Sequence, residues 1–221
     1  VYGDATALNV RRDSVAKEMV HILVGITPEG YKEILDYQIY PTESSSNYHD
    51  MLVDIQTRGV EDVLLFVTDG LTGLRDKCLE AFPRAKHQSC WVHIQRNVLR
   101  LVRATDRKEI ADLLKPVYQA SDEVTAKEAL CIFNDAIFSK YPKVVKMLTD
   151  NFSLFSFLSF PKAIQRSIYT TNLIEGLNKQ LKRYTKRKEQ FPNESSLDRF
   201  LCQQMMEYNQ KFSQRIHKGF D

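Results

Sequence analysis

The chain has 221 residues, a formal net charge of +3 and an apolar fraction of 43%. Such a chain is long enough to bury a sizeable core, and its composition excludes the disordered and fibrous classes of protein. No apolar stretch reaches the roughly 20 residues that a membrane-spanning helix needs, so we expect no membrane partner. The four cysteines are widely scattered and suggest no disulfide framework, which favours a reducing, cytoplasmic setting.

The first forty residues are predicted to form three antiparallel strands. Residues 1–10, 17–27 and 31–40 are rich in apolar and β-branched side chains, with partial alternation. The stretch Pro28-Glu29-Gly30 provides a turn between the second and third strands. Two hairpins therefore join the three strands.

Helices and strands alternate in the next fifty residues. The serines at 44–46 are expected to cap a helix over 47–58, which Gly59 ends. The run at 63–68 is predicted to be a fourth strand, and its helical connection favours parallel pairing. A helix over 71–82 and a short strand over 87–91 are expected to follow.

Beyond this point the periodicity becomes helical. Apolar residues recur every three to four positions in several segments, which are 92–104, 107–118, 123–138, 142–154, 172–188 and 194–215. Together the elements predict an α/β fold. Its mixed sheet has three antiparallel strands followed by parallel strands, is flanked by helices and is interrupted by an all-helical insertion.

Three acids stand at unusual positions. Asp69 directly follows the buried run at 63–68, and Asp4 interrupts the first strand. Glu175 lies in the opening turn of a basic helix. Carboxylates that converge from separate elements can hold two divalent metal ions and cut phosphodiester bonds.

Each of these acids also has a purely structural interpretation. Asp4 fits an edge-strand acid, and Asp69 fits the cap of the following helix. Glu175 fits a capping arrangement with Asn172, three residues before it. Spacing alone therefore does not establish a catalytic triad.

The segment 179–188 carries six basic residues and no acid, with Tyr184 inside it. Such a local field suits a phosphate backbone, whereas the alternative is a solvated helix face. A second segment, 87–93, places Cys90 between two histidines. Zinc needs four ligands and no second Cys/His pair lies nearby, so His93 is better suited to binding phosphate or orienting an active-site group.

Taken together, several stretches resemble the catalytic domain of Mutator-type transposases of bacterial insertion sequences, a DDE family. They are Asp4-Ala5, Val67-Thr68-Asp69-Gly70-Leu71-Thr72-Gly73-Leu74, Ala81-Phe82-Pro83, Cys90-Trp91-Val92-His93-Ile94-Gln95-Arg96-Asn97, Leu114-Lys115-Pro116-Val117-Tyr118, Ile168-Tyr169-Thr170-Thr171-Asn172-Leu173-Ile174-Glu175-Gly176-Leu177-Asn178 and Phe191-Pro192-Asn193. The resemblance spans nearly the whole chain in the correct order. Cys-x2-His after the second acid and Thr-Thr-Asn-x-Ile-Glu around the third are specific as a set.

The resemblance implies an RNase H-like core over 1–95 and 165–221, with the helical insertion over 96–164. It implies that a triad of acids binds two Mg²⁺ or Mn²⁺ ions and carries the catalysis; the acids are Asp4, Asp69 and Glu175. Cys90 and His93 match the family's Cys/Asp-x2-His motif. Lys182 matches a basic position of the family and, seven residues after Glu175, falls on the same helix face.

The implied activity is cleavage of phosphodiesters at transposon ends, followed by transfer of the freed 3′-OH into target DNA. Basic residues would hold the phosphates of the double-stranded DNA; they are Lys179, Lys182, Arg183 and Lys186. A homodimer associated with the nucleoid is expected because two ends must be joined, with an end-recognition region upstream of this chain. Two alternatives remain, a non-catalytic DNA-binding scaffold derived from a transposase and an RNase H-like nuclease without strand transfer.

Overall fold

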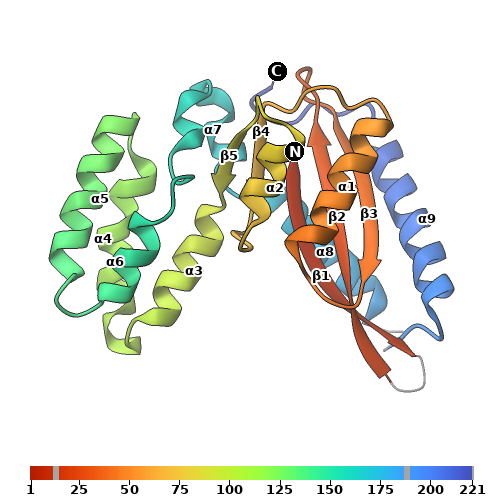
Figure 1. Cartoon of the computed structure of the whole chain (residues 1–221), viewed down its shortest axis with the longest axis horizontal. Coiled ribbons are helices and arrows are strands. Elements are labelled where there is room, and N and C mark those ends of the chain that lie inside the picture. Colours follow the sequence, from red (N-terminus) through yellow and green to blue (C-terminus); the bar gives the residue numbers. More distant parts are fainter. Residues whose placement is uncertain (12–14, 187–189, 221) are drawn as a thin grey trace. The chain divides into compact units, whose positions relative to one another are not determined.

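The computed structural model describes residues 1–11, 15–186 and 190–220 (Figure 1). The chain forms two compact units. Unit 1 comprises Val1–His87 and Thr171–Asp221, and unit 2 comprises Gln88–Thr170. Unit 2 includes more residues than the segment 96–164, and the role of that segment as an insertion remains a prediction. Within the described ranges, no helix combines the length and the apolar character that crossing a membrane requires.

Unit 1 is built on a mixed five-stranded sheet with the strand order β3-β2-β1-β4-β5. The strands are β1 (Tyr2–Arg11), β2 (Val15–Ile26), β3 (Lys32–Tyr40), β4 (Leu65–Thr68) and β5 (Lys86–Ser89), whose last two residues belong to unit 2. β2 pairs antiparallel with both β1 and β3, whereas β4 pairs parallel with β1. This confirms the predicted α/β fold with three antiparallel strands followed by a parallel strand.

Helices cover both faces of this sheet. They are α1 (Ser45–Thr57), α2 (Leu74–Ala81), α8 (Asn172–Thr185) and α9 (Glu194–Phe212). A Cβ atom built on Gly3 would lie 3.5 Å from the Tyr48 ring of α1, whereas the next residue, Asp4, bonds to Asn178 of α8. Because successive strand residues face opposite sides, α1 and α8 lie on opposite faces (Figure 1).

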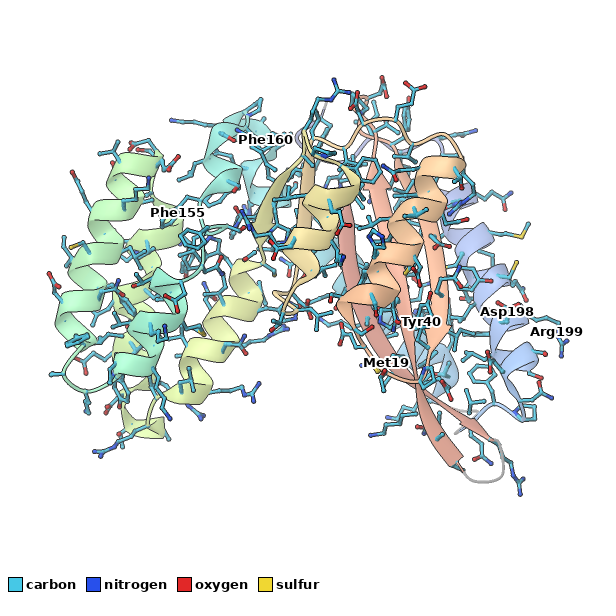
Figure 2. All side chains as sticks on the ribbon, in the orientation of Figure 1. Met19, Tyr40, Phe155, Phe160, Asp198 and Arg199 are labelled. Carbon is cyan, nitrogen blue, oxygen red and sulfur yellow. The ribbon has the colours of Figure 1, made fainter. Side chains whose placement is uncertain are left out.

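α9 shares the face of α8. The Tyr37 hydroxyl donates to Asp198 of α9, at 3.0 Å, and Asp198 projects from that helix (Figure 2). Tyr37 is in register with Ile22, which is in register with Asp4, so the three side chains point to one face. This face therefore carries the first acid together with both C-terminal helices.

Local signals explain how α1 and α2 begin. Ser44 caps α1 as predicted, because its hydroxyl accepts a hydrogen bond from the Asn47 N–H at 3.3 Å. α2 begins at Leu74, three residues later than predicted, and Gly73 occupies its N-cap position. The helix therefore starts after a loop that follows Asp69, not directly at the strand end.

The face between α1, α2 and the sheet holds the apolar core of unit 1. Its largest fully buried side chains include Tyr48, Phe66 and Met51. Each fully buried side chain of this size stabilises the fold by roughly 1.5–3 kcal/mol relative to an exposed one. All four residues of β4 are buried, and Asp69 directly follows them.

Unit 2 is mainly helical. It contains α3 (Trp91–Leu101), α4 (Arg107–Gln119), α5 (Glu123–Ile137), α6 (Pro142–Thr149) and α7 (Lys162–Ile168), with 3₁₀ turns at Ala104–Asp106 and Ser156–Ser159. The four predicted helices are present in the structure.

Several predicted boundaries are wrong. Trp91 was expected to end a strand but begins α3, where its indole N–H donates to the Leu154 carbonyl at 2.8 Å. The helix expected over 142–154 ends at Thr149, and the Asn151 side chain then turns the chain by accepting from the Ser153 N–H at 2.9 Å. α7 has no counterpart in the prediction.

The C-terminal helices also end earlier than expected. α9 ends at Phe212 instead of residue 215. α8 ends at Thr185 with Lys186 at its C-cap position, and the last two residues of the predicted helix, 187–188, lie outside the described ranges.

Candidate active site

Asp4 is a buried acid on a central strand. β1 lies between β2 and β4, so the edge-strand interpretation of Asp4 is wrong. The side chain is 8% exposed. One carboxylate oxygen accepts from Asn178 Nδ2 at 2.8 Å, and the other accepts from the Ala5 N–H at 2.9 Å. These hydrogen bonds fix the carboxylate on the face that α8 covers.

Asp69 directly follows β4. Thr68, the last residue of β4, is in register with Gly3 of β1, so Asp69 and Asp4 occupy the next positions of two neighbouring parallel strands. The Asp69 carboxylate accepts from the Leu71 N–H at 3.3 Å. Gly70 has φ of +93°, a left-handed conformation that glycine adopts without strain. Since Gly73 is the N-cap of α2, the interpretation of Asp69 as the helix cap is wrong.

Glu175 is the fourth residue of α8 and is 8% exposed. Thr171 occupies the N-cap position and Asn172 is the first helical residue, so Asn172 is not the N-cap that the predicted capping arrangement assigns to it. Glu175 Oε2 lies 3.8 Å from Lys179 Nζ, one turn further along the helix.

Asn178 connects the helix to the strand. It lies three residues after Glu175, and residues at this spacing share a helix face. Its side-chain amide donates to Asp4, and Asn178 is itself 7% exposed. The face of α8 that carries Glu175 is therefore the face that binds Asp4. The sequence contains a signal for this role, because Asn178 ends the motif around Glu175, but we did not predict it.

The negative charges of Asp4 and Asp69 affect the pKa of a buried tyrosine, Tyr48. Burial raises the pKa of Tyr48 well above its ordinary value, and the charges of Glu43, Asp69 and Asp4 raise it further. The Tyr48 ring lies over β1 at Gly3. Asp4 and Asp69 therefore contribute to the potential at one point in the core of unit 1.

A neutral histidine supports the strand that precedes Asp69. Thr68 Oγ1 and His87 Nε2 lie 2.9 Å apart in a buried hydrogen bond. Burial, with a smaller contribution from the Arg75 charge, lowers the pKa of His87 to about 4. The imidazole is therefore uncharged at neutral pH and helps to fix the end of β4.

The donor chemistry of the three acids suits a hard cation. Mg²⁺ and Mn²⁺ prefer carboxylate oxygens, and Asp4, Asp69 and Glu175 offer three such groups within unit 1. As arranged in the parts of the chain that the structure describes, no group of three or more His, Cys, Asp or Glu side chains is close enough to hold a metal ion. The three acids therefore fit a divalent cation in ligand type and lie on adjoining elements of unit 1, but the described arrangement does not bring all three within metal-binding distance of one another.

The other motif residues lie in unit 2. Cys90 is fully buried and directly precedes α3. His93 is partly exposed in the first turn of α3, with its Nε2 atom 3.4 Å from Arg96 Nη1. The three acids lie in unit 1.

The predicted DNA-binding residues are exposed on or directly after α8. They are Lys179, Lys182, Arg183 and Lys186. Lys182 and Lys186 also line an open groove of about 510 Å³ between α8 and β1. The groove is completed by Ala7, Leu8, Asn9, Thr185, Gln190 and Phe191. Basic side chains at a groove of this kind favour contact with an anionic polymer.

Comparison with known proteins identifies the family of this chain. Residues 1–215 match the family model described as Transposase, Mutator family. The chain belongs to the Mutator family of transposases. This confirms the resemblance that the motifs indicated.

Several Mutator-family relatives align along the chain. It is 45% identical over 217 residues to the transposase for insertion sequence element IS905 of Lactococcus lactis subsp. lactis (strain IL1403), an alignment that covers 98% of this chain and 56% of the relative. It is 38% identical over 209 residues to the transposase for IS1201 of Lactobacillus helveticus, covering 94% and 57%. It is 27% identical over 223 residues to the transposase for IS256 in transposon Tn4001 of Staphylococcus aureus, covering 99% and 57%. The chain thus spans little more than half the length of these relatives.

Proposed function

We propose that this chain is the catalytic part of an insertion-sequence transposase that cuts double-stranded DNA at transposon ends and joins the freed 3′-OH to target DNA. The observation that carries the proposal is the placement of the three acids on adjoining elements of unit 1. Asp4 and Asp69 follow the same register position of β1 and β4, and Glu175 shares a helix face with the Asn178 that binds Asp4. The mixed sheet, with β4 parallel to β1, supports an RNase H-like classification.

The three acids are the proposed ligands of two Mg²⁺ or Mn²⁺ ions. When bound, such ions lower the pKa of a water molecule and stabilise the oxygen that leaves the phosphate. Two of the ligands, Asp4 and Glu175, are buried, and a buried carboxylate is costly unless its charge is compensated. Asn178 orients Asp4, and Lys179 offsets part of the charge of Glu175.

The exposed cations of α8 are the proposed DNA contacts. Lys182 and Lys186 line the groove beside β1, and Lys179 and Arg183 are exposed on the same helix. Contacts of this kind hold phosphates and fix the position of the duplex, but they do not read bases. Recognition of the transposon ends is therefore assigned to a part of the protein outside this chain, and joining two ends favours a homodimer.

Cleavage by the full-length protein tests the proposal. With Mg²⁺ and a duplex carrying one transposon end, Asp69→Asn is expected to reduce the cleavage rate by at least about 100-fold, because it removes a carboxylate that is proposed to hold a catalytic metal ion. Asp62→Asn is the matched control, since Asp62 is an exposed acid of unit 1 that pairs with Arg84. Cleavage by Asp69→Asn at the wild-type rate would show that the proposal is wrong.

Two other results would identify an alternative function. Salt-dependent DNA binding without any metal-dependent cleavage would indicate a scaffold derived from a transposase. Cleavage without joined product, after a target duplex is supplied, would indicate a nuclease that lacks strand transfer.

A further inference from the structure

A second group of cations lies where β3 begins and α9 ends. Lys32 is the first residue of β3, Lys211 lies in the last turn of α9, and Arg215 follows that helix. Lys32 Nζ is 4.0 Å from the centre of the Phe212 ring, and Lys211 Nζ is 5.3 Å from it. One aromatic ring thus holds two ammonium groups near each other by cation–π contact. We name Lys32, Lys211 and Arg215 the C-terminal basic cluster.

The backbone fixes this cluster in place. Ile216 pairs with Tyr31 in an antiparallel bridge, and the His217 N–H donates to the Gly30 carbonyl at 2.8 Å. Gly30 has φ of +87°, and a Cβ atom there would lie 2.6 Å from Phe220 Cβ, so this close approach needs glycine. The segment after α9 is therefore anchored to the β2–β3 turn, beside Lys32.

The cations of the cluster influence one another. Burial lowers the pKa of Lys32, and the charges of Arg215 and Lys211 lower it further. Burial and the Lys32 charge likewise lower the pKa of His217.

The cations of the cluster form no ion pair with an acid in the described part of the chain. Within residues 1–11, 15–186 and 190–220, no ion pair of 4.0 Å or less involves Lys32, Lys211 or Arg215. Glu33 is adjacent in sequence, but strand alternation directs it to the opposite face from Lys32. A bound anion would therefore stabilise the cluster.

The strand register places the cluster far from the groove on α8. Lys32 is in register with Ile26 of β2, whereas Asn9, which lines the groove, is in register with Lys17 of β2. Ile26 and Lys17 are nine residues apart, about 30 Å at roughly 3.3 Å per residue. Asp4 lies between these two levels, opposite Ile22. All of these elements belong to unit 1.

We propose that the C-terminal basic cluster is a second phosphate-contact surface for duplex DNA, at the opposite end of the sheet from the α8 lysines. This inference rests on the proposed function, because it takes duplex DNA as the ligand. A separation of about 30 Å corresponds to roughly nine base pairs at about 3.4 Å each. One duplex thus contacts both the α8 lysines and the C-terminal basic cluster, and Asp4 lies between these two contacts along the strand direction.

The test measures binding of the 221-residue chain to a labelled 30-base-pair duplex, by fluorescence anisotropy, in EDTA and over a series of salt concentrations. The cluster variant is Lys32→Gln/Lys211→Gln/Arg215→Gln. A charge-matched control is Lys115→Gln/Lys127→Gln/Lys146→Gln, in which each lysine already pairs with an acid on its own helix or at its end in unit 2. A third variant, Lys182→Gln/Lys186→Gln, reports on the α8 surface.

The cluster variant is expected to bind about tenfold more weakly at low salt than the control. Its plot of log K against log salt concentration should be less steep by about 2 to 3, because each lost phosphate contact changes the slope by roughly 0.9. A charge-preserving variant, Lys32→Arg/Lys211→Arg/Arg215→Lys, should bind like wild type, which separates loss of charge from loss of folding.

Three results would overturn the inference. If the cluster variant matches the control while the α8 variant is weakened, the cluster does not contact DNA and the proposed function stands. If the charge-preserving variant binds as weakly as the cluster variant, the effect is structural. If wild type shows no salt-dependent binding, both the inference and the proposed DNA contact are wrong.

Discussion

The two units differ in what they bury. Among residues 88–170, all of which the structure describes, no acid, histidine, lysine or arginine is buried. The buried Gln88 of unit 2 is instead fully bonded to the backbone. Its side-chain amide donates to the carbonyls of Ser89 and Leu154, and its oxygen accepts from the Phe157 N–H. Among its described residues, unit 1 by contrast buries five ionisable side chains of these kinds, which are Asp4, Glu18, His21, His87 and Glu175.

Buried neutral groups and buried ionisable groups serve different purposes in a fold. A buried neutral amide whose hydrogen bonds are all satisfied determines how a loop packs, and its burial costs little free energy. A buried carboxylate or imidazole lowers stability unless its charge is compensated or absent, so a fold keeps such groups where they bind or react. We infer that unit 1 carries the reaction and that the buried groups of unit 2 serve its own packing.

The largest expected effect on stability is in the core of unit 2. Trp91 is fully buried, with its ring 5.5 Å from that of Tyr118 and its N–H bonded to Leu154. Trp91→Ala should lower the free energy of unfolding by about 3–5 kcal/mol, measured by urea titration with circular dichroism. Phe152→Ala is the control, because Phe152 is 85% exposed and its loss should cost less than about 0.5 kcal/mol. A loss below about 1 kcal/mol for Trp91→Ala would contradict this description of the core.

A pH-dependent effect is expected in unit 1. The pKa of His87 in the folded chain is about 4, below its ordinary value of 6.5, so the unfolded chain binds more protons between these values. His87 therefore lowers stability as the pH falls from about 6.5 to 4 and has no such effect above that window. Relative to wild type, His87→Gln should gain about 2–3 kcal/mol between pH 7.5 and pH 4.5, measured by urea unfolding at both values. An equal difference at both pH values would show that His87 is not held neutral.

A smaller effect is expected where α8 meets β1. Asn178→Ala removes the hydrogen bond to the Asp4 carboxylate and should lower the free energy of unfolding by about 1–2 kcal/mol. Asn172→Ala is the matched control, because Asn172 is exposed on the same helix. If the two variants lose equal stability in thermal or urea unfolding, the contact between Asn178 and Asp4 does not support the site.

Local signals in the sequence account for much of the fold of unit 1. The strand boundaries of β1 to β4 agree with the prediction within two residues, and Ser44 and Gly59 lie at the predicted ends of α1. Trp91 was misassigned because an apolar run beside Cys90 is compatible with a strand, whereas its bond to Leu154 is a tertiary contact that periodicity does not contain. α7 was missed because it has only seven residues.

The acids of the site were predicted, but their connection was not. Asn178 and Asp4 are 174 positions apart, and their contact depends on which strand lies under α8. The exclusion of the edge-strand interpretation likewise depends on the position of β1 in the sheet. Strand order is a property of the assembled fold, so the residues alone left these interpretations open.

Metal binding tests most directly whether the three acids of unit 1 form one site. Isothermal titration calorimetry with Mn²⁺ compares the 221-residue chain with Asp4→Ala, Asp69→Ala and Glu175→Ala, each shown to be folded by circular dichroism. We expect wild type to bind the metal and each variant to lose most of that binding. If wild type binds no Mn²⁺, even when duplex DNA is added, or if the folded variants bind as wild type does, the acids do not form a metal site.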